Sequence, residues 1–322
     1  MAAPLPTLPV RLAQRGVSRR EFLRFCAFTS AVLALPAGAT PRIVRALSAS
    51  ATLLPLVWLE FQSCTGDTES FTRASNPTAA QLLLEVLSVN FMETLMAPAG
   101  ESAEKSLADT LAQYPRQYIA VVEGSIPTRD GGVYCTVGGR TALAIAEEVC
   151  RNSMATIAVG TCAFAGGWPG AAPNPTGALG VKDAVTGIPK LINMPGCPVN
   201  VANLTALVVH YLTYNAWPAT DSQGRPQFAY GEEIHDDCPR HDHYEAGRFA
   251  LAWGDAGHRA GYCLFRLGCR GPRTRHNCDS VKWNGGTNWP VGAGHPCIGC
   301  AQPNFWDSMT PFYVPLPGDG DD

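Results

Sequence analysis

The sequence has little charge. Asp, Glu, Lys and Arg make up only 16% of its 322 residues, and the formal net charge at pH 7 is −3. It shows no basic patch with interleaved aromatic residues, so nothing points to a nucleic-acid partner. The apolar run over residues 25–39 is shorter than the roughly 20 residues that a transmembrane helix needs. The C-terminal PFYVPLPGDGDD, broken by proline and acidic, is no membrane anchor either.

What the sequence does contain is enough apolar material for a sizeable core. Hydrophobic residues make up 46% of the chain, and 32 glycines and 26 prolines indicate many loops. A length of 322 residues predicts about two domains.

The N-terminus has the layout of a twin-arginine export signal. Ser18–Arg24 (SRREFLR) supplies the basic region, and residues 25–39 supply the apolar region. Ala37–Ala39 (AGA) has the small residues typical of a cleavage site. The alternative is a buried or amphipathic N-terminal helix in a protein that stays in the cytoplasm. We expect a leader or N-terminal extension over residues 1–50.

Strand-like and helix-like segments alternate between residues 51 and 215. Short β-branched or apolar runs predict buried strands at 53–61, 89–92, 118–122, 155–159 and 191–194. Longer periodic segments predict helices at 78–88, 102–113, 139–152 and 201–214. This alternation predicts an α/β fold, with a parallel sheet and helices on both of its faces.

Three cysteines follow predicted strands, each in a glycine-containing loop. They are Cys64, Cys162 and Cys197, and Asp67 stands three residues after the first of them. Ligands of open parallel sheets bind beyond the carboxyl ends of the strands, so these side chains are expected to share one site. Buried thiols or disulfides are the alternatives.

From residue 216 to 322 the strand patterns fade, and cysteine, histidine, glycine and tryptophan dominate. Spacing gives one group of four, His235, Cys238, Cys263 and Cys269, and one group of three, Cys278, Cys297 and Cys300. Three thiols without a fourth ligand suit structural zinc poorly. An iron–sulfur cluster accepts three thiolates when one iron corner is missing, and histidine can replace cysteine. Disulfides stay possible, and six cysteines allow 15 pairings.

The remaining cysteines and histidines are interpreted as structural. Packing thiols are expected at Cys26, Cys135 and Cys150, and surface or supporting roles at His210, His241, His243, His258, His276 and His295.

Several motifs, in this order, resemble the small subunit of nickel–iron hydrogenases over the chain after residue 50. They are CTG with ESF near Cys64, VEGSIPT at 122–128, GTCAFAGG at 160–167, MPGCPVN at 194–200, HDDCPRHDHYEAGRF at 235–249, CLFRLGCRGP at 263–272 and HPCIGCAQPNFWD at 295–307.

The resemblance implies a flavodoxin-like domain, a loop-rich cluster domain and three iron–sulfur clusters. It assigns a proximal [4Fe–4S] cluster to the first cysteine set and a distal [4Fe–4S] cluster to the His235 group. It assigns a medial [3Fe–4S] cluster to the Cys278 group, because Pro290 stands where a fourth cysteine would be.

Asp67 departs from the usual pattern, in which cysteine completes CTGC. An aspartate ligand resembles the actinobacterial-type, high-affinity and oxygen-tolerant subgroup. The departure therefore predicts that Asp67 is the fourth proximal ligand.

By this resemblance the chain carries electrons from H2 oxidation at the nickel–iron centre of a partner large subunit to an external acceptor, such as a cytochrome or quinone. It has no catalytic residue of its own. A higher oligomer of heterodimers is expected, and localisation follows from whether the leader is used. The alternatives are an iron–sulfur subunit of another respiratory complex and a zinc- or disulfide-stapled binding protein.

Overall fold

The computed structural model describes residues 6–49, 53–74 and 87–316. The chain divides into two compact units, residues 1–228 and 229–322. The domain limits expected from the sequence, 1–50, 51–215 and 216–322, stay predictions.

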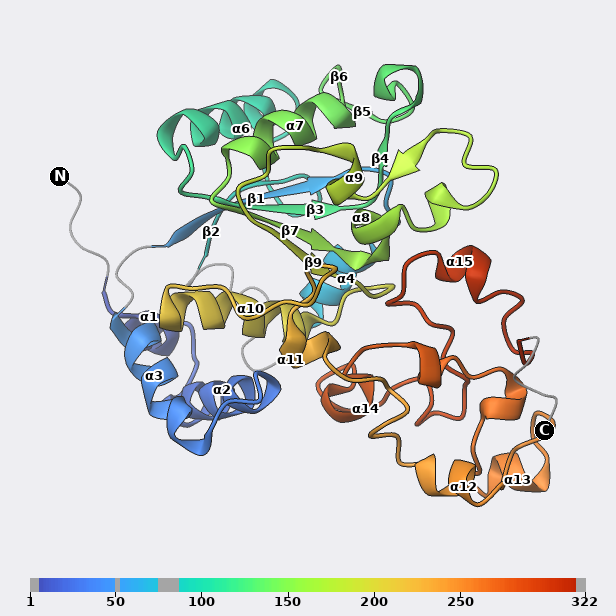
Figure 1. The fold of residues 1–322 in the computed structure, drawn as a ribbon. Coiled ribbons are helices and arrows are strands. Elements are labelled where there is room, and N and C mark those ends of the chain that lie inside the picture. Colours follow the sequence, from blue (N-terminus) through green and yellow to red (C-terminus); the bar gives the residue numbers. More distant parts are fainter. Residues whose placement is uncertain (1–5, 50–52, 75–86, 317–322) are drawn as a thin grey trace. The chain divides into compact units, whose positions relative to one another are not determined.

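The first unit is built on a five-stranded parallel sheet with the strand order β2-β1-β3-β7-β9 (Figure 1). Its strands are β1 (Leu54–Glu60), β2 (Leu87–Met92), β3 (Ile119–Glu123), β7 (Ala155–Val159) and β9 (Leu191–Met194). Every residue of β3 and β7 is buried, as expected where helices cover both faces. The order of the strands along the sheet is that of a flavodoxin-like fold, which confirms the predicted fold class.

Side chains of the strands alternate between two apolar layers. Val57, Leu59 and Val122 pack into one layer with helices α6 (Glu101–Gln113) and α7 (Ala142–Asn152). On the other face, Trp58, Val121 and Ile157 meet α10 (Val201–Tyr214) and Phe71 of α4 (Gly66–Thr72) around a small apolar cavity. Period-two alternation therefore places buried apolar side chains on both faces of the sheet.

Helices α1 (Leu8–Gln14), α2 (Arg19–Val32) and α3 (Thr40–Ala49) precede the sheet, and α2 and α3 pack on α10 (Figure 1). The Ser18 side chain accepts a bond from the Glu21 N–H and the Glu21 carboxylate accepts one from the Ser18 N–H, which makes a capping box. Cys26 is fully buried, as expected of a packing thiol. No helix in the described residues is long and apolar enough to cross a membrane.

Shorter elements complete the first unit. They are β4 (Ile126–Pro127), β5 (Thr136–Val137), β6 (Arg140–Thr141), β8 (Ala178–Leu179), α8 (Gly160–Ala165), α9 (Val181–Ala184) and the 3-10 turns η1 (Ala37–Ala39), η2 (Arg129–Gly132) and η3 (Trp168–Gly170).

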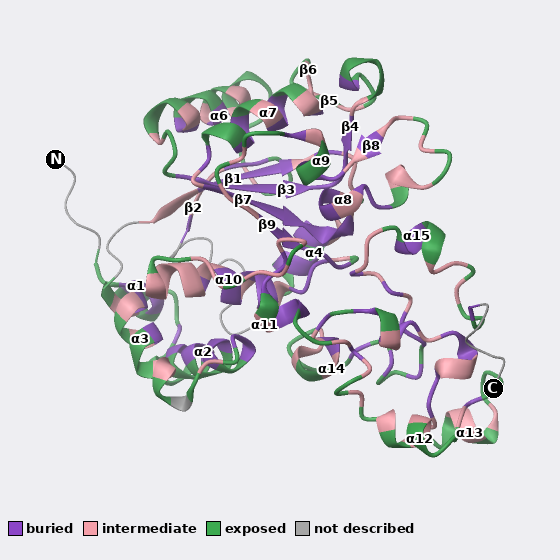
Figure 2. Ribbon diagram, viewed as in Figure 1, coloured by how far each residue is buried: buried purple, intermediate pink, exposed green. Residues whose placement is uncertain are grey.

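The second unit consists mainly of loops joined by short helices, and its buried residues are scattered along them (Figure 2). The helices are α12 (His241–Glu245), α13 (Ala256–Arg259), α14 (Cys278–Val281) and α15 (Phe305–Ser308), with the 3-10 turns η4 (Phe265–Leu267) and η5 (Gly271–Arg273). Helix α11 (Gln227–Tyr230) spans the point in the sequence at which the first unit ends and the second begins. Its core combines Ile234, Leu264 and Trp289 with candidate ligands such as Cys278 and Cys297.

Most of the predicted elements are present, with two differences. The helix predicted at 78–88 lies largely outside the described residues, and its last two residues belong to β2, where Leu87 pairs with Leu54 of β1. The helix predicted from residue 139 begins at Ala142, because Gly138 and Gly139 turn the chain between β5 and β6.

Candidate functional site

The loops that carry the first set of candidate ligands leave the carboxyl ends of β1, β7 and β9. Cys64 and Cys197 are exposed, and Cys162 is half-buried in α8. Thr65, with φ of 62°, turns the chain from β1 into α4. Parallel strands end at one edge of the sheet, so the topology places these three loops at the same edge.

Asp67 is buried within this group, with 8% of its surface exposed. Its Oδ1 accepts a 2.6 Å hydrogen bond from the N–H of Val199, in the loop that also carries Cys197. Its Oδ2 lies against Gly160, where a Cβ would stand only 2.1 Å away. Gly160, with φ of +75°, therefore leaves room for a carboxylate that joins the three loops.

Behind Asp67 lies Glu123, the last residue of β3, which is fully buried. Its carboxylate accepts hydrogen bonds from the Asp67 N–H (3.1 Å), the Thr68 N–H (3.1 Å) and hydroxyl (2.6 Å), and the Trp58 indole (3.1 Å). These donors hold the first turn of α4. Sequence reasoning missed this supporting role, although VEGS stands out as the end of a strand.

Burial sets the protonation of this pair of carboxyls. It raises the pKa of Asp67 to about 8, aided by the nearby charge of Glu123, whereas the bond from Val199 opposes the rise. Burial also raises the pKa of Glu123, against the hydrogen bonds that it accepts. A cation at this edge would therefore take the place of the proton on Asp67 and offset the repulsion that the ionised Asp67 would otherwise have with Glu123.

Two thiols at this edge, those of Cys162 and Cys197, are also protonated in the absence of a cation. Desolvation, with the neighbouring acidic groups, raises the pKa of Cys162 to about 11 and that of Cys197 to about 12. Trp168 opposes both shifts, because its backbone N–H donates to the Cys162 sulfur and its indole donates to the Cys197 sulfur. Nothing in the sequence marks Trp168 as a partner of two sulfurs.

In the second unit, the four predicted distal ligands line one cavity. Its volume is about 310 Å3 with its open mouth, and its walls include His235, Cys238, Cys263 and Cys269. Apolar side chains such as Leu264 and Phe265 form much of the remaining wall. The His235 ring lies against the His241 ring in a tilted arrangement, with 4.7 Å between the ring centroids.

The three predicted medial ligands also lie together. Cys278 and Cys297 belong to one buried cluster, and burial together with the nearby Cys300 and Cys297 raises the pKa of Cys278. His276 lies behind Cys278, 3.0 Å from sulfur to Nδ1. Pro290 is exposed, and its carbonyl accepts bonds from the backbone of residues 293 and 295.

A direct hydrogen bond joins the distal and medial groups. The N–H of Cys297 donates to the sulfur of Cys269 over 3.3 Å. The Cys297 sulfur accepts a further bond from the N–H of Gly299 at 3.4 Å. Such bonds stabilise negative charge on cysteine sulfur.

Within its described residues, the structure shows these thiols neither paired with one another nor grouped around a single metal ion. All twelve cysteines, each within the described ranges, are free. In the described part of the chain, no three Cys, His, Asp or Glu side chains are placed to hold a single metal ion. The ligands of an iron–sulfur cluster bind different irons, so they do not converge on one point as zinc ligands do.

Comparison with known proteins accounts for this arrangement. The family of C-terminal regions of the "NiFe/NiFeSe hydrogenase small subunit" matches residues 230–313, and the family "NADH ubiquinone oxidoreductase, 20 Kd subunit" matches residues 64–211. The periplasmic [NiFe] hydrogenase small subunit 1 of Nitratidesulfovibrio vulgaris is 45% identical over 304 residues, covering 94% of this chain and 95% of that protein.

Solved structures give the same result. The reduced, active Ni-Fe-Se hydrogenase from Desulfomicrobium baculatum has a TM-score of 0.76 at 33% identity, covering 82% of this chain and 100% of that chain. The actinobacterial-type NiFe-hydrogenase from Ralstonia eutropha H16 has a TM-score of 0.74 at 25% identity, covering 88% of each chain.

Small subunits of this family carry iron–sulfur clusters and pair with a large subunit that holds the Ni–Fe centre. The chain belongs to the family of small, electron-transfer subunits of the nickel–iron hydrogenases.

Proposed function

We propose that this protein passes electrons from the large subunit to an external acceptor through three clusters, in an oxygen-tolerant hydrogenase of actinobacterial type. The proposed ligands are Cys64, Asp67, Cys162 and Cys197 for a proximal [4Fe–4S] cluster; Cys278, Cys297 and Cys300 for a medial [3Fe–4S] cluster; and His235, Cys238, Cys263 and Cys269 for a distal [4Fe–4S] cluster. When bound, the clusters supply the one-electron redox chemistry.

The observation that carries this proposal is the position of Asp67. Its carboxylate is buried, bonds to the Cys197 loop through Val199 and fits against Gly160 at the start of the Cys162 helix. An aspartate that had no part in the site would not need this buried position between Val199 and Gly160. The residues present therefore fit a cluster with one oxygen ligand.

The cavity in the second unit supports the distal assignment. The four proposed ligands line one cavity together with apolar side chains such as Leu264 and Phe265. His235 supplies the nitrogen ligand, and its neighbour His241 is partly exposed. The grouping of Cys278, Cys297 and Cys300, with Pro290 turned outward, supports three thiolates at the medial site.

The chain's own residues tune the proximal site. A carboxylate is a harder and less electron-releasing ligand than a thiolate, so Asp67 changes the potential at which the site accepts an electron. Glu123 fixes the backbone of Asp67 and Thr68. Trp168 donates to the sulfurs of Cys162 and Cys197. We propose that this altered potential underlies function in air.

Two comparisons bear on the subgroup. The structure from Ralstonia eutropha is named as actinobacterial-type, at 25% identity. The periplasmic relative from Nitratidesulfovibrio vulgaris has higher identity, 45%. The proposal that this chain belongs to the actinobacterial-type subgroup therefore depends on Asp67, and a substitution of Asp67 tests it.

The test compares H2 oxidation in air by the wild-type heterodimer and by Asp67→Cys. We expect the variant to keep its activity without oxygen and to lose it faster in air. Asp109→Cys adds a thiol at an exposed ion pair with Lys105 and serves as the matched control. Equal tolerance in all three proteins would refute the role of Asp67.

We also propose that Ser18–Arg24 acts as a twin-arginine signal, with retention of an uncleaved N-terminus as the alternative. N-terminal sequencing of the purified complex distinguishes them. A start near Thr40 shows cleavage, whereas an intact Met1 supports retention.

A further inference from the structure

His276 is a buried histidine next to one of the proposed medial ligands. Only 3% of its surface is exposed. Its Nδ1 lies 3.0 Å from the sulfur of Cys278, two residues further along the chain, and the two atoms share a hydrogen bond. Cys278 is buried as well, with 7% of its surface exposed. The bond between them is therefore shielded from bulk water.

The state of the sulfur decides which atom donates in this bond. An imidazole nitrogen donates when it carries a proton and accepts when it does not, and a thiol does either weakly. A cysteine sulfur that binds a metal has lost its proton, so it accepts and cannot donate. With iron on Cys278, the bond therefore requires a proton on Nδ1 of His276.

The backbone on both sides of His276 is held by the segment that precedes the distal ligand His235. The N–H of Ile234 donates to the carbonyl of Thr274 at 2.8 Å. The N–H of Asn277 donates to the carbonyl of residue 229 at 3.0 Å. These bonds fix the position from which the His276 side chain leaves the chain.

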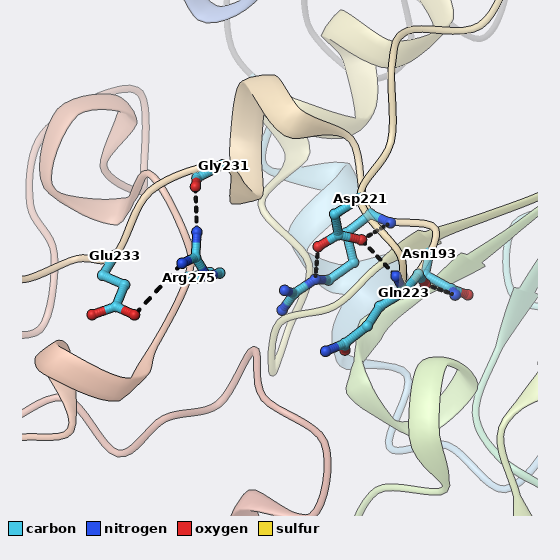
Figure 3. A network of polar contacts seen from close by, with 7 residues as sticks. Asn193, Asp221, Gln223, Gly231, Glu233 and Arg275 are labelled. Carbon is cyan, nitrogen blue, oxygen red and sulfur yellow. Dashed lines mark hydrogen bonds and ion pairs between the residues drawn. The ribbon is translucent and has the colours of Figure 1, made fainter.

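Arg275 explains why the next side chain points inward. Residues 233 and 275 form an antiparallel bridge, and the Arg275 side chain donates to the Gly231 carbonyl and lies 3.7 Å from Glu233 (Figure 3). The Arg275 side chain is 45% exposed. Successive side chains of an extended segment point to opposite sides, so His276 faces the interior of the second unit.

Two aromatic side chains restrict the rotation of the His276 ring. The ring of Tyr230 meets it edge-on, with 5.2 Å between the centroids and 89° between the planes. The ring of Trp283 lies nearly parallel to it, with 6.4 Å between the centroids. Edge-to-face and offset parallel contacts are the arrangements that aromatic rings favour. Nδ1 is thereby kept directed at the sulfur of Cys278.

We propose that His276 is a positioning residue that donates a hydrogen bond from Nδ1 to the sulfur of Cys278 and thereby raises the reduction potential of the medial cluster. The proposal rests on the assignment of that cluster to Cys278, Cys297 and Cys300. A donor to a ligand sulfur stabilises the reduced cluster more than the oxidised one, because the reduced cluster carries more negative charge. Hydrogen bonds to the sulfurs are among the factors that set cluster potentials.

The experiment uses two substitutions that separate the donor from the ring. His276→Phe keeps a ring beside Tyr230 and Trp283 but removes the N–H, whereas His276→Asn keeps an N–H donor on a short side chain and removes the ring. His210→Phe in the first unit is the matched control, because Nδ1 of His210 bonds to the carbonyl of Ala216 at 2.9 Å and not to a sulfur. The medial midpoint potential of each purified heterodimer is measured by redox titration followed by EPR.

We expect a lower medial midpoint potential in His276→Phe and a value near that of the wild type in His276→Asn and His210→Phe. Labelling histidine with 15N should add a nitrogen coupling to the pulsed-EPR spectrum of the medial cluster, and His276→Phe should lack that coupling. Loss of the medial signal from His276→Phe alone would also show that the donor is required.

Other outcomes overturn the inference. An unchanged or raised medial potential in His276→Phe refutes the effect of the hydrogen bond, and so does an equal change in His210→Phe. An equal fall in His276→Phe and His276→Asn assigns the effect to packing of the ring, as does loss of the cluster from both variants or from the asparagine variant alone. A wild-type protein without a medial signal refutes the cluster assignment itself, so the failure of the proposed function is distinguishable from the failure of this inference.

Discussion

Gly160→Ala should damage the proximal site through a collision with Asp67, which lies in another loop. Gly160 has φ of +75°, and an added Cβ would lie 2.1 Å from Oδ2 of Asp67 and 2.7 Å from its Oδ1. The left-handed conformation alone costs a non-glycine residue about 1–2 kcal/mol. Displacing Asp67 would also leave the buried N–H of Val199 without its acceptor, at about 1–3 kcal/mol.

Gly139→Ala separates the two costs. Gly139 has φ of +79°, but nothing lies within 4 Å of a Cβ added there. It should therefore show the backbone strain without the collision. For a unit of this size, each kcal/mol lowers the melting temperature by about 2–4 °C. Gly160→Ala should melt at a lower temperature than Gly139→Ala, and it alone should lose proximal iron.

The assays are thermal unfolding and iron content of the purified heterodimer, with EPR to identify the missing cluster. Adding Asp67→Ala to Gly160→Ala removes the collision, so the double variant should be no less stable than the sum of its single variants predicts. Equal iron content and equal melting temperature in Gly160→Ala and Gly139→Ala would refute the contact between Asp67 and Gly160.

Three further predictions concern other parts of the molecule. Trp168→Phe removes the indole donor to Cys197 and should lower the proximal midpoint potential measured by EPR, whereas Trp253→Phe, at an exposed ring in the second unit, should not. Ser18→Ala removes one half of the capping box and should destabilise α2 by about 1 kcal/mol, seen as faster amide exchange in residues 19–32 of the full-length chain; unchanged exchange would contradict it. Because iron binds the thiolate and the pKa of Cys197 is raised to about 12, cluster reconstitution into the iron-free protein should become more favourable from pH 7 to pH 9. Cluster reconstitution that is equally favourable at pH 7 and pH 9 would contradict this prediction.

The sequence predicts the sheet well because its strands have one dominant requirement. Ala155–Val159 and Leu191–Met194 match the predictions residue for residue, since buried parallel strands need short, continuous apolar runs. Val201–Tyr214 also matches, because Asn200 caps its first turn. The predicted start of α7 is too early, because the turn at Gly138 and Gly139 depends on pairing between β5 and β6.

The candidate site also has some residues that the sequence predicts and others that it does not. The cysteines stand out in the sequence because cysteine beside glycine at a strand end is rare and chemically specific. Glu123 and Trp168 receive no role from the sequence, and Glu123 acts through partners distant in the chain. Glu123 reaches Asp67 and Thr68 across more than 50 positions, and no local pattern reports such a contact.

The packing of the N-terminal helices on α10 has a consequence for the order of synthesis. Residues 19–32 leave the ribosome early, but Val201–Tyr214, on which they pack, is made only after the whole sheet. Until then α2 lacks its contact with α10, and its apolar face and its three arginines are more accessible to any factor that binds them. Once α10 is in place, the packing of α2 on α10 competes with the binding of that factor. The time taken to translate residues 33–214 thus sets an interval during which the N-terminus is available for recognition.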